Sequence, residues 1–400
     1  MDAPPTGFPR ELLTQPWRAR LEYFRDYTIA HPRLVAARDA LVGAIHERAP
    51  NSLILVLGPT GVGKTTLRLK IEQLMITEML ADLRADPGRL PVVSVECIAP
   101  ESGTFSWRDH FRRLLLEMEE PLVDYKMNPD APVRVGNRVA KFLPSARAAG
   151  SEYHYAVELA LRFRRPVAVL IDEAQHLARM GSGRRLSDQL DVIKSIANRT
   201  GTIHVLLGTY ELLAFRNLSA QLSRRSIDIH FQRYRADDSG DRRMFLTVLR
   251  SFEQHLPLAQ PPDLVNEWEY LYERSIGCVG VLKEWLVRAL TRVLARNSPV
   301  LTPRDLQEHA LSVPQCEKLL SEALEGESRL AESAEQRSRL RTRLGLIPPG
   351  RKAIDSTVGE AMTVTAEAAP RKVRRVPGRR RPGRDPVGRT EAPYASVATL

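Results

Sequence analysis

Paired cysteines and long apolar runs are both missing from this sequence, and each absence excludes a class of protein. The 400 residues include three cysteines, Cys97, Cys278 and Cys316, which lack the paired spacing of a zinc site or a disulfide framework. No run of about 18 apolar residues occurs, and no signal-peptide pattern follows the first methionine. We therefore expect reduced, buried thiols in a soluble cytoplasmic protein with no membrane partner.

Acidic residues are outnumbered, with 48 Asp and Glu against 59 Lys and Arg, and the formal net charge is +11. Most of the excess lies near the end of the chain, because residues 371–389 contain nine basic residues and one acid, Asp385. The rest of the chain is therefore only mildly basic. This charge favours an anionic partner such as nucleic acid, although charge alone identifies none.

Five short segments rich in β-branched and aliphatic residues indicate strands: Leu53–Leu57, Val92–Cys97, Val167–Ile171, Ile203–Leu207 and Ile227–Phe231. Runs such as Val-Ala-Val-Leu-Ile are apolar throughout, which is typical of strands covered on both faces. Helical or loop segments separate the strands, and this alternation predicts parallel crossovers. The pattern therefore predicts an α/β fold with a doubly wound, parallel, five-stranded sheet.

A phosphate-binding loop, or P-loop, follows the first of these strands. Gly58-Pro-Thr-Gly-Val-Gly-Lys-Thr-Thr66 matches G-x-x-x-x-G-K-[ST] between a strand and a helix, the setting that this pattern requires. Its glycines let backbone N–H groups point at phosphate oxygens. Lys64 should reach the β- and γ-phosphates of ATP, and the Thr65 hydroxyl should ligate Mg²⁺. The predicted nucleotide-binding residues are Gly58, Pro59, Thr60, Gly61, Val62, Gly63, Lys64, Thr65 and Thr66.

Two adjacent acids, Asp172 and Glu173, directly follow the third strand. At the end of a strand beside the P-loop, Asp172 would hold Mg²⁺ through water, and Glu173 would deprotonate the attacking water. The alternative is that the two carboxylates cap a helix. His176 lies nearby, but no second His or Cys stands at metal-ligand spacing, so we expect it to cap a helix or face solvent.

Two further features predict catalytic side chains. Thr209 follows the fourth strand and is the candidate for sensing the γ-phosphate, although Gly-Thr pairs are also common in turns. Arg224 and Arg225 precede the fifth strand, where an arginine could reach a neighbouring subunit's nucleotide and neutralise transition-state charge. The alternative for both arginines is a solvated surface position. The predicted catalytic set is Glu173, Lys64, Arg224, Arg225 and Thr209.

Strand patterns stop after about Ala236, and helical patterns follow at Arg243–His255, Leu264–Ser275 and Val281–Ala295. From about Ile347 onward Pro, Gly, Arg, Ala and Thr dominate, and such a segment cannot bury enough apolar surface to offset its ordering entropy. We therefore predict four regions: an N-terminal segment at 1–45, a nucleotide-binding α/β domain at 46–235, a helical lid with C-terminal helices at 236–345, and a disordered basic tail at 346–400.

Taken together, these motifs resemble the AAA+ ATPases of Tn-type transposons, the TnsC and TniB proteins, including those associated with CRISPR systems. The likeness extends over residues 20–310 and is carried by the P-loop and by these blocks: Tyr23–Pro32, Asp172–His176, Leu190–Ser195, Gly208–Leu212, Gln221–Ser226, Ile229–Tyr234 and Gly277–Trp285. The P-loop and the acidic pair identify only the superfamily. The blocks Gly208-Thr-Tyr and Gln221-Leu-Ser-Arg-Arg, in this order, are more specific.

The resemblance implies an AAA+ P-loop fold with a small helical lid, slow and DNA-dependent ATP hydrolysis, and assembly into rings or helical filaments on duplex DNA. It also implies a role in transposition, in which the oligomer couples TniQ-like target-selector proteins to recruitment of the transposase. One feature departs from many AAA+ proteins, which place an arginine in a lid motif Gly-x-x-Arg. Here Gly277-Cys-Val-Gly280 offers none, and Lys283 and Arg288 are the remaining candidates.

Basic residues between the strands are candidates for contact with DNA phosphates, a binding mode whose affinity falls with salt. None belongs to a base-reading motif, so we expect little sequence specificity. The alternative is a solvated basic face. The candidates are Arg108, Arg112, Arg113, Arg134, Arg138, Lys141, Arg147, Arg184 and Arg185. The stretch Arg371–Arg384 could form a nonspecific DNA arm, a docking segment for the transposase or a solubilising tail.

Two other functions fit the same nucleotide-site residues. A replication-type helicase loader or initiator would share all of them. A signalling ATPase would use its oligomer as a protein-interaction module and would ignore DNA. Binding of duplex DNA separates the signalling ATPase from the other two functions, and a helicase partner separates the loader from the transposition regulator.

Overall fold

The computed structural model describes residues 7–47, 53–99, 105–121, 123, 148–178, 183–216 and 226–346. The chain divides into two compact units, Met1–Glu332 and Ser333–Leu400. In the second unit the structure describes α16 (Ala334–Arg343), which begins with a capping box between Ser333 and Gln336. The predicted tail, apart from its first residue, lies outside the described residues. No helix in the described ranges is long and apolar enough to span a membrane.

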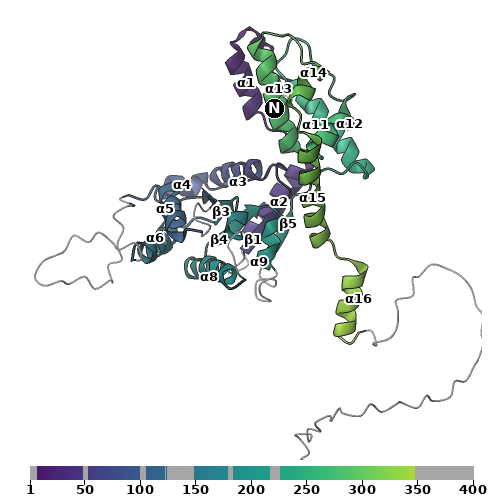
Figure 1. Cartoon of the computed structure of the whole chain (residues 1–400). Helices are drawn as coiled ribbons and strands as arrows, with labels where there is room; N and C mark the ends of the chain where they lie inside the picture. Colours follow the sequence, from purple (N-terminus) through teal and green to yellow (C-terminus); the bar gives the residue numbers. More distant parts are fainter. Residues whose placement is uncertain are drawn as a thin grey trace, which may run out of the picture. The chain divides into compact units, whose positions relative to one another are not determined.

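Five parallel strands form one sheet in the first unit, in the order β2-β3-β4-β1-β5 (Figure 1). The sheet confirms the predicted doubly wound arrangement, and each strand lies within a residue of its predicted position. The order places β1 beside β4 and β4 beside β3, so these three strands end at one edge of the sheet. The strands are β1 (Leu53–Leu57), β2 (Val92–Glu96), β3 (Ala168–Asp172), β4 (Ile203–Gly208) and β5 (Ser226–His230).

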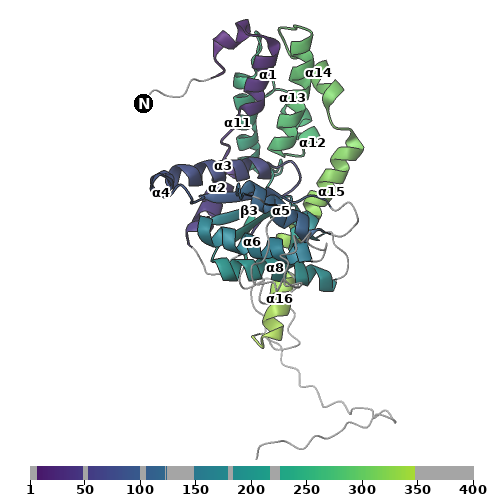
Figure 2. The same ribbon diagram turned by 90° about the vertical axis from the view of Figure 1, so that its left-hand side faces the viewer.

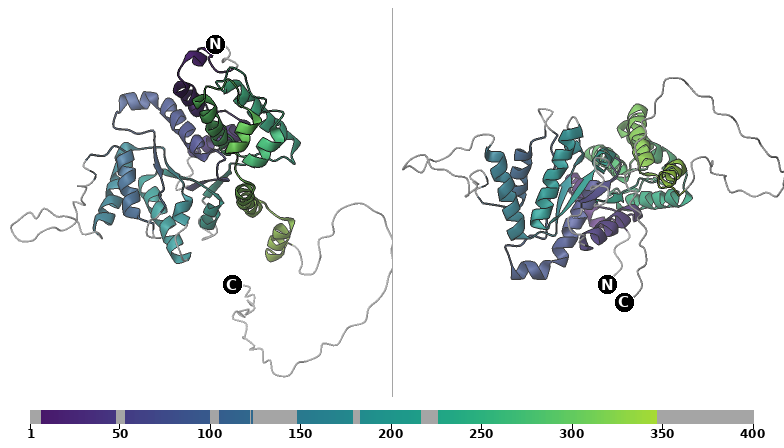
Figure 3. Two further views of the ribbon diagram at one scale, coloured as in Figure 1. Left: turned by 45° about the horizontal axis from the view of Figure 1, so that its top comes forward. Right: turned by 90° about the horizontal axis from the view of Figure 1, so that it is seen from below.

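Helices cover both faces of the sheet, as the two views in Figure 3 show. Alternate residues of β1 point to opposite faces, so Leu53 and Leu55 belong to one core cluster, and Ile54 and Val56 belong to the other. This double burial accounts for the continuous apolar runs in the sequence. The first cluster includes α5 (Trp107–Glu117), α6 (Ala148–Arg164) and α8 (Gly183–Thr200), and the second includes α2 (Pro32–His46) and α3 (Lys64–Glu78).

A helical lid follows β5 and has an apolar core of its own. Phe245 and Phe252 pack there with Trp285, whose indole N–H donates to the carbonyl of Leu306 at 2.8 Å. Because the Trp285 hydrogen bond is satisfied inside the core, this large side chain can be fully buried. The lid helices are α11 (Ser239–His255), α12 (Trp268–Ser275), α13 (Val279–Ala295) and α14 (Pro303–His309), and the first three agree with the predicted helical patterns.

The N-terminal segment is divided between the lid and the sheet domain. After a short 3₁₀ helix, η1 (Arg10–Thr14), α1 (Trp17–Asp26) contributes Leu21 and Phe24 to the lid core. The next helix, α2, instead packs Leu34 and Leu41 beneath the sheet. His31 caps the start of α2 by accepting from the N–H of Leu34. Residues 27–31 therefore cross from the lid to the sheet domain.

A long helix, α15 (Val313–Leu330), leaves the lid and runs toward the sheet domain (Figure 2). Near its start, Cys316 packs in a small apolar cluster with lid residues. Near its end, Leu330 packs against the core cluster that contains α5, α6 and α8. Gly326 lies so close to the ring of Tyr210 that an added Cβ would be 2.0 Å from it. The helix thus bridges the lid and the sheet domain. All three cysteines are free and buried, as expected.

Candidate nucleotide-binding site

The P-loop joins β1 to α3 and presents the start of α3 to an anion. Gly61 and Gly63 have φ values of 74° and 114°, in the left-handed region that residues with side chains rarely adopt. Gly63 is the N-cap of α3, and among the described residues no side-chain cap hydrogen bond closes this end of the helix. Free N–H groups and the positive end of the helix dipole favour a phosphate at this position.

The Lys64 ammonium is buried inside this loop. Its Nζ donates to the carbonyl oxygens of Gly58, at 3.1 Å, and Pro59, at 2.9 Å. Burial lowers the pKa of Lys64, and the neighbouring carboxylates of Glu173 and Asp172 oppose that shift. Phosphate oxygens placed on the loop would offer Lys64 a stronger, charged acceptor than these carbonyls.

The two predicted acids lie at the end of β3. Asp172 is 3% exposed, and its Oδ1 accepts from the N–H of Glu173 at 2.9 Å. Glu173 has a φ of 51°, an uncommon conformation for a residue with a side chain. Its carboxylate accepts from the side-chain amide of Gln175. Such strained positions persist where the surrounding structure holds them, and they gather at functional sites.

Arg68 belongs to the same site, although it is not among the site residues predicted from the sequence. Its Nε donates to Oδ2 of Asp172 at 3.3 Å, and its guanidinium also pairs with Glu72. The Arg68 side chain is 21% exposed, so the pair with Asp172 is only partly screened by water. Arg68 comes one helical turn after Lys64, and this i,i+4 spacing was the signal that could have revealed it.

Thr209 follows β4 at the same edge of the sheet. Its N–H donates to Oε1 of Gln175 at 3.2 Å, and Gln175 also donates to Glu173, so one side chain connects Thr209 to the acid. The Thr209 hydroxyl is buried and has no hydrogen-bond partner among the described residues. An unpaired buried hydroxyl is destabilising, and a γ-phosphate oxygen would satisfy it. This feature fits the predicted sensor role.

A cavity of about 440 Å³ lies next to these groups, and we call it the phosphate-side cavity. Thr60, Glu173 and Thr209 line it from the sheet domain, and α15 lines it from the opposite side. The P-loop, the end of β3, the end of β4 and a helix outside the predicted motifs therefore meet around one space. The predicted Mg²⁺ ligands, the Thr65 hydroxyl and the Asp172 carboxylate, are both oxygen donors, which Mg²⁺ prefers.

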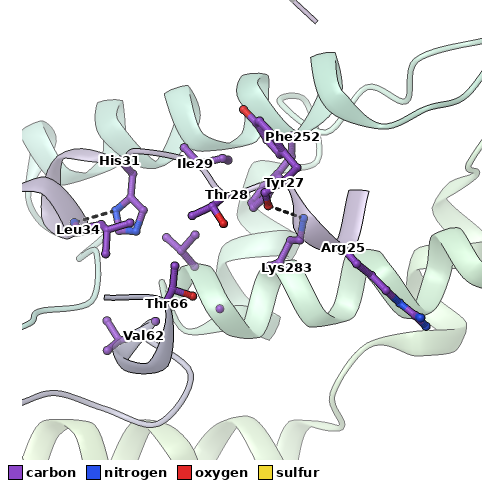
Figure 4. A pocket seen from close by; sticks show the side chains of 13 residues that line it. Arg25, Tyr27, Thr28, Ile29, His31, Leu34, Val62, Thr66, Phe252 and Lys283 are labelled. Atoms are coloured by element: carbon purple, nitrogen blue, oxygen red, sulfur yellow. Dashed lines mark hydrogen bonds between the residues drawn. The ribbon is translucent and has the colours of Figure 1, made fainter. Parts of the chain in front are cut away.

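A second cavity, of about 110 Å³, lies between the lid and the sheet domain (Figure 4), and we call it the base-side cavity. Ile29 and His31 from the crossing stretch line it, together with Val62 of the P-loop and Val279 of the lid. Burial lowers the pKa of His31 to about 4, so its ring is neutral near pH 7. A mostly apolar wall with a few fixed polar groups is typical of small-molecule sites.

The lid contacts the P-loop directly, and this contact explains the missing lid arginine. The N–H of Val281 donates to the carbonyl of Gly61 at 3.1 Å. A Cβ at Gly280 would lie 2.5 Å from that same oxygen, so no side chain fits there. Lys283 points elsewhere, toward Tyr27 (Figure 4), donating to its carbonyl at 2.9 Å with Nζ 3.8 Å from the centroid of the Phe24 ring. Arg288 is exposed on α13.

Several predicted residues lie elsewhere or outside the described residues. Arg108 is exposed on α5, Arg112 is on the same helix, and Arg113 pairs with Asp109 at 2.7 Å. Arg184 and Arg185 belong to α8. The remaining predicted residues lie outside the described residues: Arg134, Arg138, Lys141, Arg147, Arg224 and Arg225.

Comparison with known proteins places an AAA domain at residues 47–215. No curated protein sequence matches the chain. The ADP form of the Aeropyrum pernix ORC2 protein is 14% identical, with a TM-score of 0.46 over 72% of this chain and 71% of that one. A Walker-type ATPase of Pyrococcus abyssi is 18% identical, with a TM-score of 0.38 over 79% and 85%. Drosophila ORC bound to DNA is 13% identical, with a TM-score of 0.41 over 86% and 76%.

The AAA domain match covers β1 to β4 but not β5, and it includes the P-loop, the acidic pair and Thr209. With the observed strand order, it identifies the sheet domain as an AAA+ P-loop fold. A fold of this kind implies nucleotide binding, usually with Mg²⁺.

Proposed function

We propose that this AAA-domain chain binds ATP with Mg²⁺ and hydrolyses it to ADP and phosphate. The observation that carries the proposal is the meeting of Lys64, Asp172, Glu173 and Thr209 around the P-loop, at the ends of three adjacent strands. Ligands of parallel α/β sheets bind at this edge. The base and the sugar would lie toward the base-side cavity, and the γ-phosphate would lie toward the phosphate-side cavity.

The chemistry assigned to each residue follows from its position. Glu173 accepts a proton from a water molecule as the water oxygen bonds to the γ-phosphorus, and the bond from that phosphorus to the β,γ-bridging oxygen breaks. Lys64 and the P-loop N–H groups stabilise negative charge on the phosphate oxygens. The Thr209 hydroxyl donates to a γ-phosphate oxygen. Thr65, and Asp172 through water, would hold Mg²⁺, which would supply positive charge to the β- and γ-phosphates.

Glu173→Gln tests the reaction. The amide keeps the shape of the side chain but cannot take a proton, so we expect hydrolysis to fall by about 100-fold or more with ATP binding unchanged. Steady-state phosphate release and equilibrium binding of a fluorescent ATP analogue measure the two effects. Glu96→Gln is the matched control, because Glu96 pairs in register with Asp172 on the neighbouring strand but is exposed. Undiminished hydrolysis in Glu173→Gln would show that Glu173 is not the base.

We further propose that ATP stabilises an oligomer on duplex DNA and that hydrolysis dismantles it, with slow, DNA-dependent turnover. The support is the resemblance of residues 20–310 to the TnsC and TniB proteins, together with the basic composition. In this role Arg224 or Arg225 completes the site of the next protomer. The oligomer couples a TniQ-like target selector to the transposase in regulating transposition.

Imaging of the purified chain with duplex DNA and a non-hydrolysable ATP analogue tests this assembly. We expect rings or helical filaments that disappear with ADP, and an affinity for DNA that falls with salt at a log–log slope near −0.9 per phosphate neutralised. Assembly that requires a helicase partner would favour a replication-type loader or initiator. Failure of DNA either to bind or to stimulate hydrolysis would favour a signalling ATPase.

A further inference from the structure

The phosphate-side cavity has an unusual wall, because one side of it is a helix that comes after the lid. The α15 residues that line the cavity include Glu322, Glu325, Gly326 and Arg329. They repeat at intervals of three and four, so they form one face of the helix. The face turned toward the catalytic residues therefore carries both acids and an arginine.

The position of this helix is fixed at several points beside the site. Gly326 is in close contact with the ring of Tyr210, the residue directly after Thr209. On the flank of α15, Glu327 pairs with Arg233 at 2.8 Å, and the Arg233 side chain is only 6% exposed. This largely buried pair is bidentate, and such a pair resists displacement more than a surface pair does. Arg329 comes three residues after Gly326 and is held at the same cavity.

The charge balance around this cavity is the key observation. Four carboxylates line it, from Glu173, Glu211, Glu322 and Glu325, and among the described residues that line it Arg329 is the only Arg or Lys. Lys64 approaches the phosphates from the P-loop itself, and the lid brings no cation, because Gly280 is against Gly61 and Lys283 points to the N-terminal segment. Lys318 already pairs with Glu322 at 3.2 Å, so Glu173 and Glu325 are the acids whose charge a γ-phosphate in this space would meet. A cation on this wall would offset that charge, in addition to Lys64 and Mg²⁺.

Arg329 is also available for a new partner. Its closest carboxylate contact among the described residues is to Glu325, at 3.8 Å, and its side chain is 52% exposed. A loose, half-exposed ion pair within one helix contributes little stability. The Arg329 guanidinium can therefore leave Glu325 and bind a phosphate at a small cost in free energy. A planar guanidinium can then donate two hydrogen bonds to phosphate oxygens.

We propose that Arg329 of α15 binds the γ-phosphate of ATP held in the same chain, and so makes the site distinguish ATP from ADP. This inference rests on the proposed ATPase function. Arg329 is a binding residue contributed by the chain's own C-terminal helix, separate from any arginine that a neighbouring subunit supplies. The same contact would attach α15 more firmly to the sheet domain while ATP is bound.

Equilibrium binding to the full-length chain tests the proposal, with Mg²⁺ and either a non-hydrolysable ATP analogue or ADP as the probe. For Arg329→Ala we expect the dissociation constant of the ATP analogue to rise about tenfold, since hydrogen bonds to charged groups are the strong ones. The value for ADP should change by less than about twofold, because ADP lacks the phosphate that Arg329 contacts. Arg329→Lys, which keeps the charge, should lie between Arg329→Ala and the wild type.

Two control variants separate this effect from general changes in charge or folding. Arg304→Ala removes an arginine from a similar i,i+4 pair, with Glu308, on a lid helix away from the cavity, and should change neither constant. Glu325→Gln releases Arg329 and removes an acid, so it should leave ATP-analogue binding unchanged or tighter. The unfolding temperature of Arg329→Ala without nucleotide should match that of the wild type.

The outcomes are distinct. Equal weakening of ATP-analogue and ADP binding in Arg329→Ala, or no weakening of either, overturns the assignment of Arg329. Failure of the wild-type chain to bind either nucleotide overturns the proposed function, and this inference with it. A loss confined to the ATP analogue, partly restored by lysine, supports the inference.

Discussion

The two cavities beside the P-loop differ in size, in lining and in the parts of the chain that build them. The base-side cavity is small, at about 110 Å³, and lies between the lid and residues 27–31. The phosphate-side cavity is larger, at about 440 Å³, and carboxylates from both the sheet domain and α15 surround it. The first would hold the parts that ATP and ADP share, whereas the second would hold the part in which they differ. Substitutions at the base-side cavity should therefore weaken ATP and ADP binding alike, whereas substitutions at the phosphate-side cavity should mainly affect ATP binding.

The largest effect on nucleotide binding is expected where the lid contacts the P-loop, and it tests the difference between the two cavities. Gly280→Ala would place a Cβ 2.5 Å from the carbonyl oxygen of Gly61 and would push the lid off the loop. We expect dissociation constants for ATP and ADP to rise together, by about tenfold, as one strained contact of roughly 1 to 3 kcal/mol would produce. Equilibrium binding of both nucleotides measures this.

Gly43→Ala is the control, because an added Cβ at this position on α2 meets nothing within 4 Å. It should leave nucleotide binding unchanged and slightly stabilise the helix. If Gly280→Ala weakens only ATP, the base-side cavity does not hold the shared part of the nucleotide, and the contrast between the cavities is wrong.

A smaller effect is expected on the phosphate side, at Arg68. Its ion pair with Asp172 competes with Mg²⁺ for the same carboxylate, so Arg68→Ala should lower the Mg²⁺ concentration that gives half-maximal hydrolysis, by about threefold. A magnesium titration of phosphate release measures the shift. Arg89→Ala removes a similarly exposed arginine that pairs with Asp82, away from the site, and should have no effect. A rise in the Mg²⁺ requirement would instead mean that Arg68 orients Asp172 for the metal.

A third effect concerns the wall of the base-side cavity and depends on pH. Burial lowers the pKa of Lys283 from 10.5 to about 7, so between these values the folded chain holds fewer protons here than the unfolded chain. Unfolding therefore takes up a proton at Lys283 in this pH range. Because raising the pH makes that uptake less favourable, the free energy of unfolding should rise from about pH 7 toward pH 10.

Lys283→Met removes this dependence. We expect the difference in unfolding free energy between the wild type and the variant to change by about 1 kcal/mol between pH 7 and pH 9, allowing for partial solvent screening. Denaturant unfolding at the two pH values measures it. A difference that is the same at both values would show that Lys283 stays charged, held by the carbonyls of Phe24 and Tyr27.

The parts of the site that could be predicted from the sequence are those whose residues are adjacent in the chain. The strand Leu53–Leu57, the loop after it and the acids at the end of β3 could be predicted because their function requires them to be adjacent in the chain. Arg68 could have been predicted in the same way, because it lies four residues after Lys64, on the same face of α3. The sequence also showed that Gly280 stands where an arginine was sought, but the reason, the carbonyl of Gly61, became clear only from the packing.

The rest depends on contacts between distant segments. Nothing local in α1 predicts that Phe24 packs with Phe252 of the lid while Leu34, ten residues later, packs under the sheet. Likewise Gly326 looks like an ordinary helix interruption until the ring of Tyr210 is placed against it. The predicted C-terminal helices were assigned to the lid region, and their contribution to the phosphate side could not be read from periodicity.

The path of the chain between the lid and the sheet domain has a mechanical consequence. Residues 27–31 and the stretch after β5 each cross between the two bodies, and two such connections define an axis about which the lid can turn. The third connection, α15, is a stiff helix anchored at Tyr210, away from the first crossing. If the lid turns about this axis, α15 must either bend or detach from Tyr210. Opening of the base-side cavity is therefore coupled to movement of α15 beside Thr209, in the phosphate-side cavity.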